Sequence, residues 1–451
     1  MDKIVKAQRD FFLSGATLPY EFRLRALSDL KAAIQRHQAD ICEAMRADLN
    51  KSELEAYMTE TGMVLDELGY AIRHLKRWTK PQRKPTPIAQ LPSRSFVISE
   101  PYGVALIMAP WNYPLELCLC PLIGAISAGN CVVLKPSAYA PAVSAVIKKM
   151  LGEIFPPEYV AVIEGGREQN DALLNQRFDY IFFTGSVTVG KLVMERAAKN
   201  LTPISLELGG KSPVIVEKTA NIKLAAKRLA FGKCLNAGQT CIAPDYVLVD
   251  RSVKKAFVDA LITAIKEFFP NGYDDYVSIV NDKHFQRVMG LMQGEKVVFG
   301  GNSDAATRFI EPTILNDITF DSPVMQQEIF GPLIPLIEYD DIDEAIELIQ
   351  GRPKPLALYL FTTSKEIENK VLSCVSFGGG CINDTMVHAA TSCMGFGGVG
   401  ESGMGSYHGV LSFETFSHKK SIVKKSNKFD LKLRYRPYSK KKLDWIRKFL
   451  K

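Results

Sequence analysis

Four apolar runs set the architecture of this chain: "GVALIMAP" (103–110), "CVVLKPS" (131–137), "YVAVIEGG" (159–166) and "YIFFTGS" (180–186). Each opens with four or more consecutive uncharged residues, which is typical of strands buried on both faces of a parallel sheet. The intervening segments are long enough for crossover helices, so the pattern predicts an open parallel α/β sheet. Ligands of such sheets bind beyond the carboxyl ends of the strands, where functional residues are therefore expected.

The composition is that of a large globular protein. A chain of 451 residues with 47% hydrophobic and 23% charged residues can build two or three domains. Its net charge of +7 is unevenly placed: fourteen Lys and Arg against two Asp give residues 419–451 a charge of +12, which leaves −5 for the preceding chain. A mildly acidic body argues against nucleic-acid binding, so only the tail suits an anionic partner.

The cysteines and the N-terminus indicate a reducing compartment. Nine cysteines, an odd number without a CxxC pair, predict neither a disulfide framework nor a zinc ribbon, and the CxC spacing of Cys118 and Cys120 is poor for a metal. We therefore predict free thiols and no metal site. The first ten residues, "MDKIVKAQRD", lack an export or organelle signal, so a cytoplasmic protein is expected.

The flanking segments predict further elements around the sheet. Apolar residues recur at helical spacing over residues 22–78, which predicts two or three packed helices. Residues 80–103 are rich in proline and then alternate, as expected for an extended arm that projects from a domain. The 18 uncharged residues 117–134 just reach the length of a membrane span, but their internal Pro, Gly and Asn favour a buried helix, a turn and a buried strand.

The loop "GSVTVGKL" (185–192) follows the fourth run and could offer backbone N–H groups to phosphates. A Walker A loop needs Ser or Thr where this chain has Leu192, which argues against an NTPase. The Rossmann pattern fails as well, because its middle glycine falls at Val187. A dinucleotide could bind here only by another approach of its pyrophosphate, and a tight helix start explains the glycines equally well.

Three residues have surroundings that suit catalysis. Cys241, in "NAGQTCIAPD", lies where neither helix nor strand periodicity is visible, unlike the cysteines in apolar runs. Glu207, in "ISLELGGKSP", ends a predicted strand, where burial would tune it toward a general base; an ion pair with Lys211 is the alternative. Asn112, in "APWNYP", presents an immobilised amide that suits either an oxyanion donor or a structural turn.

These motifs occur together with "LKPS", "FTGS", "QEIFGP" and "FGGVGESGMGSYHG" in an order that resembles the aldehyde dehydrogenase superfamily over about residues 20–425. The segments "CINDTMVH" and "SGMGSYHGVLSFETFSHKK" look most like its class 3 branch, which includes fatty and aromatic aldehyde dehydrogenases. The resemblance implies two open parallel-sheet α/β domains, a bridging β-element and a homodimer. It divides the chain into a NAD(P)-binding domain (1–82 and 101–206), a catalytic domain (207–404), the bridging element (83–100 and 405–436) and a basic tail (437–451).

The resemblance also assigns roles to residues. Cys241 would be the nucleophile that forms a thiohemiacetal and then a thioester, Asn112 and the Cys241 N–H would hold the oxyanion, and Glu207 would activate water. The implied contacts to NAD or NADP are Lys135 at the adenosine ribose, Gly185, Ser186 and Gly190 along the pyrophosphate, and Glu328 and Phe330 at the nicotinamide ribose. The alternatives without a role in cofactor binding are that Lys135 is a surface charge, Phe330 a core aromatic and Glu328 a helix-end carboxylate. Glu328 is also a candidate for proton transfer.

Three other functions share features with this sequence. A CoA-acylating dehydrogenase would share Cys241, but such relatives generally lack a base at the position of Glu207. A catalytically silent protein on the same fold is disfavoured because Cys241, Glu207 and Asn112 are all present. A Cys-His hydrolase would need one of the six histidines beside Cys241, and His388 and His408 have no assigned role.

The resemblance also predicts an acyl-chain pocket. Its walls would lie near Tyr113, Leu115, Leu117, residues 241–245 and residues 385–391. Their apolar character permits medium- or long-chain aliphatic and aromatic aldehydes without choosing between them.

One departure from the family pattern concerns the cofactor. After "LKPS" many relatives have a glutamate that binds the adenosine ribose hydroxyls, and this chain has Ala138. Without that carboxylate, a 2′-phosphate is not repelled, which predicts dual use of NAD and NADP. The alternative is that an acid in "EGGREQND" reaches the ribose and restores a preference for NAD.

The tail "YSKKKLDWIRKFLK" (438–451) is basic and amphipathic. If it is helical, Leu443, Ile446 and Leu450 form one stripe with lysines around it, which suits peripheral contact with an anionic membrane surface. It is too short to span a bilayer, and the alternative is a solvated or self-packed tail.

Overall fold

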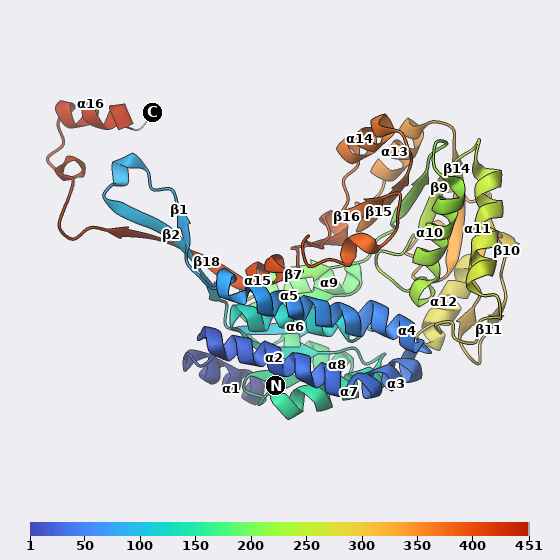
Figure 1. Ribbon diagram of the computed structural model, residues 1–451, viewed down its shortest axis with the longest axis horizontal. Helices are drawn as coiled ribbons and strands as arrows, with labels where there is room; N and C mark the ends of the chain where they lie inside the picture. Colours follow the sequence, from blue (N-terminus) through green and yellow to red (C-terminus); the bar gives the residue numbers. More distant parts are fainter. Residues whose placement is uncertain (450–451) are drawn as a thin grey trace.

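The computed structural model describes residues 1–449, which form two sheet-and-helix units and a projecting antiparallel ribbon (Figure 1). The first unit contains a six-stranded sheet of order β17-β7-β6-β3-β4-β5, parallel except for β17. The four apolar runs form β3 to β6, which confirms the predicted parallel sheet. The strands are β3 (Val104–Met108), β4 (Cys131–Lys135), β5 (Val160–Val162), β6 (Tyr180–Thr184), β7 (Ile204–Glu207) and β17 (Gly403–Met404).

The helices of this unit surround the sheet. The predicted helical region 22–78 is confirmed, with a π-helical turn at Tyr57–Thr61 between two of its helices. The helices are α1 (Asp2–Leu13), α2 (Tyr20–Arg36), α3 (Gln38–Leu49), α4 (Glu53–Ala56), α5 (Gly62–Trp78), α6 (Glu116–Ala128), α7 (Pro141–Ile154), α8 (Arg167–Leu174), α9 (Val187–Ala198) and α15 (Val410–Thr415). The sequence patterns did not predict α1, which docks through Gln8: its buried amide donates to the carbonyl oxygens of Val132 (2.8 Å) and Pro157 (3.1 Å).

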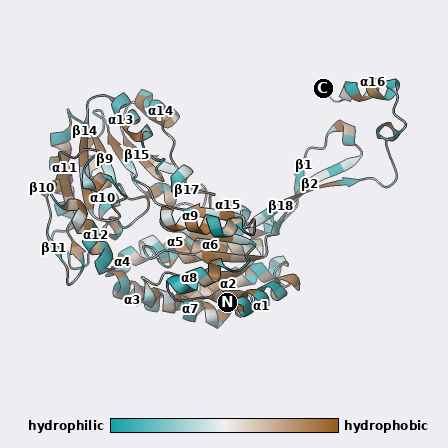
Figure 2. Cartoon of the chain, turned by 180° about the vertical axis from the view of Figure 1, so that it is seen from behind, coloured by the Kyte–Doolittle hydropathy of each residue, from teal (hydrophilic) through white to brown (hydrophobic). Residues whose placement is uncertain are grey.

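The uncharged segment 117–134 is a buried helix and strand, as predicted. Every residue of α6 is buried, and the helix ends at Gly129, whose φ of 98° only glycine adopts readily. Figure 2 shows hydrophobic colouring along α6. Among residues 1–449, no helix combines the length and apolar character needed to cross a bilayer.

The second unit contains a seven-stranded sheet of order β10-β13-β14-β9-β8-β15-β16, in which only β10 is antiparallel to its neighbour. Its strands are β8 (Pro213–Val216), β9 (Tyr246–Asp250), β10 (Lys296–Phe299), β13 (Thr313–Asn316), β14 (Leu333–Tyr339), β15 (Ala357–Phe361) and β16 (Gly379–Ile382), with a small hairpin of β11 (Ser303–Asp304) and β12 (Phe309–Ile310). The helices are α10 (Ile222–Cys234), α11 (Lys254–Phe268), α12 (Asp282–Met292), α13 (Ile342–Gln350) and α14 (Lys365–Cys374). Short 3₁₀ turns lie at Ile88–Gln90, Leu235–Gly238, Pro323–Met325, Val387–Ala389, Gly400–Ser402 and Lys432–Arg434.

The predicted arm is a three-stranded antiparallel ribbon of β1 (Gln82–Lys84), β2 (Ser93–Pro101) and β18 (Ser417–Lys425). It extends away from both units, and α16 (Lys440–Phe449) lies at its far end (Figure 1). The domain boundaries inferred from the family stay a prediction. Near one of them, β17 is hydrogen-bonded to β7, so residues just before 405 join the first sheet.

Candidate active site

The carboxyl ends of β3, β6 and β7 meet the loop before β9 around a cavity of about 390 Å³, the central cavity. It contains most of the residues that the sequence singled out, which come from both units. Its lining includes Asn112, Gly185, Ser186, Glu207, Cys241, Glu328 and Phe330. The strand ends are therefore where the candidate residues gather, as expected for open α/β sheets.

Cys241 follows a loop with unusual backbone geometry. Asn236, Ala237 and Gly238 all have positive φ (51°, 51° and 70°), and a Cβ at Gly238 would lie 2.3 Å from the carbonyl oxygen of Gly331. The Asn236 amide braces the loop by donating to the carbonyl oxygens of Asn112 (2.9 Å) and Gln239 (3.0 Å). This left-handed run explains the lack of periodicity in the sequence, and it fixes the position of the thiol.

The surroundings of the Cys241 thiol disfavour its ionised form. Burial raises its pKa well above the usual range, and the nearby carboxylates of Glu328, Glu207 and Glu116 raise it further, opposed by its own backbone N–H. A thiolate must therefore form as substrate is attacked. Carboxyl groups in the same cavity are the available proton acceptors.

Glu207 is a buried carboxyl without a partner. It is 2% exposed, and neither of its carboxylate oxygens accepts a hydrogen bond from any described residue. Burial raises its pKa well above the usual value. The alternative of an ion pair with Lys211 is wrong, because Lys211 pairs with Asp245 and donates to the carbonyl oxygens of Val324 (3.0 Å) and Gln327 (2.9 Å).

The Asn112 amide is held rigidly beside Cys241. Its Nδ2 donates one hydrogen bond to the Gln239 carbonyl oxygen at 3.1 Å, and the residue is 2% exposed. The structural reading of this amide therefore holds. It does not exclude a role as oxyanion donor, because the second N–H of the amide bonds to no described residue and the side chain lines the central cavity.

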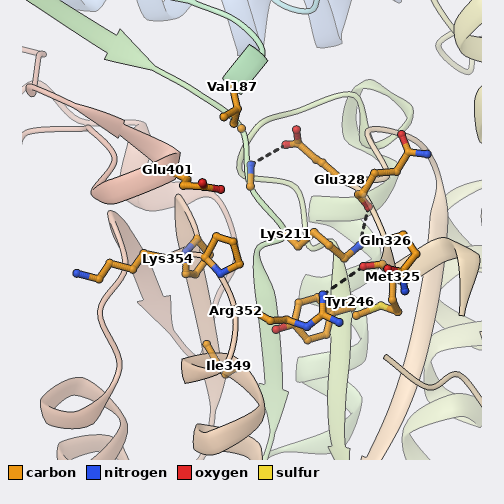
Figure 3. Close-up of a pocket in the computed structure, with 15 residues that line it drawn as sticks. Val187, Lys211, Tyr246, Met325, Gln326, Glu328, Ile349, Arg352, Lys354 and Glu401 are labelled. Carbon is orange, nitrogen blue, oxygen red and sulfur yellow. Dashed lines mark hydrogen bonds between the residues drawn. The ribbon is translucent and has the colours of Figure 1, made fainter. Parts of the chain in front are cut away.

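Glu328 lies between the central cavity and a second one of about 330 Å³, the rear cavity (Figure 3). Its carboxylate accepts the Gly210 N–H at 3.2 Å, and a Cβ at Gly209 would lie 2.1 Å from it. Burial raises the pKa of Glu328 to about 8, with Asp245 adding to the shift and the Gly210 N–H, Lys211 and Arg287 opposing it. It belongs to no helix end, since the preceding 3₁₀ turn stops at Met325.

Aromatic side chains close the same end of the central cavity. Phe330, at a φ of 46°, is only half-buried and packs edge-on against Trp111 with ring centroids 5.3 Å apart, so it is not a core aromatic. Sequence reasoning missed two residues of this wall, His284 and Arg287, because they lie on α12 without any motif. Arg287 donates to the carbonyl oxygens of Glu328 (3.1 Å) and Ile329 (2.6 Å) and so fixes the loop.

The turn between β6 and α9 has the geometry expected of a phosphate site. Ser186 caps α9 by accepting the Val189 N–H at 3.4 Å, and the helix N-terminus faces the central cavity. Gly190 lies one turn farther on, where a Cβ would come within 2.6 Å of the Leu208 side chain. Gly190 therefore serves helix packing, and its contact with a pyrophosphate stays a prediction.

Lys135 and Ala138 lie on a third cavity of about 290 Å³, the side cavity. Lys135 is 3% exposed and its Nζ donates to the Pro136 carbonyl oxygen at 2.7 Å, so the surface-charge reading is wrong. Arg167 also lines this cavity, whereas no carboxylate does among the described lining residues. Of the acids in "EGGREQND", Glu164 is paired with Lys148 at 2.6 Å.

The side cavity also fits a sugar hydroxyl. The buried Asn170 Oδ1 accepts no hydrogen bond from any described residue, so it is available to a hydroxyl donor. Together with the α9 N-terminus and the basic groups, this arrangement fits an adenine dinucleotide that extends from the side cavity to the central cavity.

A fourth cavity of about 250 Å³, the apolar cavity, opens on the other side of Cys241. The predicted walls at Tyr113 and Leu117 are confirmed, whereas Leu115 is fully buried elsewhere. Sequence reasoning missed several walls because they come from distant elements. These are Met58, Thr59, Met63, Glu116, Phe231, Leu235, Phe396, Tyr407 and His408.

The histidines do not provide a base for Cys241. His388 lies 3.5 Å from the Cys381 sulfur, and burial lowers its pKa to about 4. His408 lies 3.7 Å from Glu67. None of the hydrogen bonds described for residues 1–449 joins a histidine to Cys241, which argues against a Cys-His hydrolase. All nine cysteines are free, as predicted.

Comparisons with known proteins agree with this geometry. Residues 1–422 match the model of the aldehyde dehydrogenase family. A 4,4'-diaponeurosporen-aldehyde dehydrogenase of Staphylococcus aureus is 48% identical over 98% of this chain and 97% of its own, and a dimeric NADP-preferring aldehyde dehydrogenase of Canis lupus familiaris is 45% identical over 97% and 98%. The solved substrate-bound AldH of Staphylococcus aureus superposes with a TM-score of 0.98 at 47% identity, covering 100% of this chain and 99% of that one. Relatives support NAD or NADP as cofactor. The chain belongs to the aldehyde dehydrogenase family.

Proposed function

We propose that this enzyme oxidises medium- or long-chain aliphatic or aromatic aldehydes to carboxylic acids through a thiohemiacetal and a thioester on Cys241. The observation that carries the proposal is the position of Cys241. Its thiol lies where the central and apolar cavities meet, and the unpartnered Glu207 lines the central cavity with it. A substrate chain in one cavity and a cofactor in the other would meet at this sulfur.

The residues have distinct roles in this mechanism. The Cys241 sulfur attacks the aldehyde carbon, and the oxyanion accepts hydrogen bonds from Asn112 Nδ2 and the Cys241 N–H. A bound nicotinamide supplies a hydride acceptor. Glu207 then takes a proton from the water that attacks the thioester, which its raised pKa suits. Because this chain has Glu207, the hydrolytic outcome is favoured over acyl transfer to CoA.

The cofactor would bind along the cavities already described. Lys135 would lie at the adenosine ribose, Gly185 and Ser186 at the pyrophosphate, and Glu328 and Phe330 at the nicotinamide ribose. Among the described residues, two cations and no carboxylate line the side cavity, which supports use of NADP as well as NAD.

Activity assays test the proposal. Wild-type protein should reduce NAD or NADP, followed at 340 nm, with aliphatic or aromatic aldehydes. Cys241→Ala should lower turnover by at least about 10⁴-fold while keeping cofactor affinity, since it removes the nucleophile and little volume. Cys393→Ala, at an exposed cysteine, should leave turnover unchanged. Appreciable turnover by Cys241→Ala would refute the mechanism, and wild-type protein inert toward every aldehyde would favour a silent member of the fold.

We also infer a cytoplasmic homodimer. The projecting ribbon supports the dimer, because β18 is an edge strand of the described sheet and offers backbone groups to a second chain. The word "dimeric" in the name of the canine relative agrees. Light scattering after size exclusion should give twice the 50.1 kDa chain mass, and a monomer would refute the inference.

The tail is proposed to touch an anionic membrane surface. In α16, Leu443 and Trp445 are about half exposed (45% and 49%) among lysines and arginines, and Figure 2 shows polar and apolar residues along it. Leu450 of the predicted stripe lies outside the described residues. Full-length protein should pellet with anionic vesicles more than a chain ending at Arg436; equal pelleting would refute the contact.

A further inference from the structure

The apolar cavity has an ionisable carboxyl in its wall. Glu116 is the first residue of α6, is 8% exposed, and lines the cavity together with Cys241 and His408. Most of the remaining wall consists of hydrocarbon and aromatic side chains such as Phe231 and Leu235. A carboxyl group in such surroundings is costly unless something donates to it.

Glu116 does not serve as the cap of its helix. That role belongs to Glu60, whose Oε2 accepts the N–H groups of Leu115 (2.8 Å) and Glu116 (3.3 Å). The Cys120 thiol, one turn along the helix, donates toward the Glu116 carboxyl. A thiol is a weak donor, so most of the hydrogen-bonding capacity of this carboxyl is left for a ligand in the cavity.

His408 is held beside this carboxyl by its backbone. Its φ of 80° is rare for a residue with a side chain, and the conformation is fixed by its N–H, which donates to Ser412 Oγ at 2.8 Å. The next N–H, of Gly409, donates to Glu67 at 2.7 Å. The imidazole stacks on Tyr407 with centroids 4.1 Å apart. Backbone strain of this kind persists where the surroundings fix it, and here it places the ring in the cavity wall.

We propose that Glu116 is a specificity-determining residue: with His408 it forms a polar subsite in the apolar cavity that favours aldehydes carrying a hydroxyl group over hydrocarbon aldehydes of the same size. The inference rests on the proposed function, since it concerns the chain attached to the reacting carbonyl. A hydroxyl donates to the carboxylate, whereas a hydrocarbon displaces water and leaves the carboxylate with the weak Cys120 thiol as its donor.

The protonation of Glu116 gives this subsite a pH dependence. Burial raises the pKa of Glu116 to about 7; His408 and Cys120 lower it, while Glu60 and Glu67 raise it. Cys241 lines the same cavity, where burial raises the pKa of its thiol and so favours the neutral form. A hydrocarbon chain binds best to the neutral acid, so its KM should rise as the pH passes 7. A hydroxylated chain should lack this penalty.

Two aldehydes of nearly equal shape test the proposal: 4-(hydroxymethyl)benzaldehyde and 4-ethylbenzaldehyde. The ratio of their kcat/KM values, hydroxylated over ethyl, should fall by about tenfold or more in Glu116→Leu, mostly through KM. Leu117→Met, a substitution at a neighbouring wall residue, should change the kcat/KM values of both substrates by the same factor and so leave their ratio unchanged. The rise in KM of the ethyl compound above pH 7 should disappear in both Glu116→Leu and Glu116→Gln. Glu116→Gln keeps the size of the side chain and therefore still tests the proposal if Glu116→Leu does not fold.

The outcomes separate two failures. A ratio and a pH profile that stay unchanged in the Glu116 variants, with both aldehydes oxidised, would overturn this inference alone. Wild-type protein that oxidises no aldehyde would overturn the proposed function itself.

Discussion

Two buried carboxyl groups of this molecule have opposite surroundings. Glu60, in the π-helical turn Tyr57–Thr61, is fully buried, pairs with Lys51 at 2.7 Å and accepts two backbone N–H groups at the start of α6. Glu207, at the end of β7, is as deeply buried and receives no hydrogen bond from any described residue. Burial alone therefore does not mark a candidate catalytic acid, whereas burial at a cavity without a described partner does.

The largest effect expected from this contrast is on turnover. Glu207→Gln should slow steady-state oxidation by about 10²- to 10⁴-fold, because the amide cannot take a proton from water. Acylation should persist, so stopped-flow absorbance at 340 nm should show a burst of about one equivalent of reduced cofactor. Glu338→Gln, at an ion-paired carboxylate on β14, provides the matched control and should keep the full rate. A full steady rate in Glu207→Gln would assign the base role to Glu328.

The paired carboxylate should matter for stability. Lys51→Met leaves Glu60 buried without its cation, which should lower the free energy of unfolding by about 3–5 kcal/mol in urea titrations. The double variant Lys51→Met with Glu60→Gln should recover much of this loss, because the amide is neutral and still accepts the Leu115 N–H. If Lys51→Met is as stable as wild type, Glu60 does not depend on its ion pair with Lys51, and its contrast with the unpartnered Glu207 fails.

A third carboxyl group sharpens the contrast through pH. Burial raises the pKa of Glu328 to about 8, so the folded chain keeps a proton that the unfolded chain loses near pH 4.3. The folded state binds more protons in this window, and the contribution of Glu328 to stability therefore falls as pH rises from about 4.3 to 8. Urea unfolding at several pH values should show a weaker decline for Glu328→Gln. An identical pH dependence would place the titrating group elsewhere.

The smallest effect comes from placing a new carboxylate in basic surroundings. Ala138→Glu puts an acid in the side cavity, near Lys135 and Arg167, where it should repel a 2′-phosphate and accept ribose hydroxyls. Steady-state kinetics should show the NADP to NAD ratio of kcat/KM falling about fivefold or more. Wild-type protein that already rejects NADP a hundredfold, or a ratio unaffected by the glutamate, would show that Ala138 is not the determinant.

Features that depend on interactions between residues near in sequence could be predicted from the sequence, whereas features that depend on contacts between distant segments could not. Strands β3 to β6 were predictable because each needs only a short apolar run, and Glu207 and Asn112 because they end such runs. The lining of the apolar cavity by Met58 and His408 was not predictable, since it depends on how the π-helical turn Tyr57–Thr61 and the segment before α15 pack. Asparagine adopts positive φ more readily than most residues, so Asn236 carries a weak signal for this geometry. Ala237 carries none, because tertiary contacts impose positive φ there.

The ribbon joins chain segments that are synthesised at very different times. β2 pairs along its whole length with β18, from Ser93↔Lys425 to Pro101↔Ser417, and the first sheet also waits for β17. During translation at roughly 5–20 residues per second, β2 therefore leaves the ribosome on the order of tens of seconds before its partner exists. Until then it presents an open strand edge to other chains. The yield of native protein in a cell should therefore depend on how well this edge is shielded in the nascent chain. It should also be higher when a fusion tag is placed beyond Lys425 than when it is placed within the ribbon.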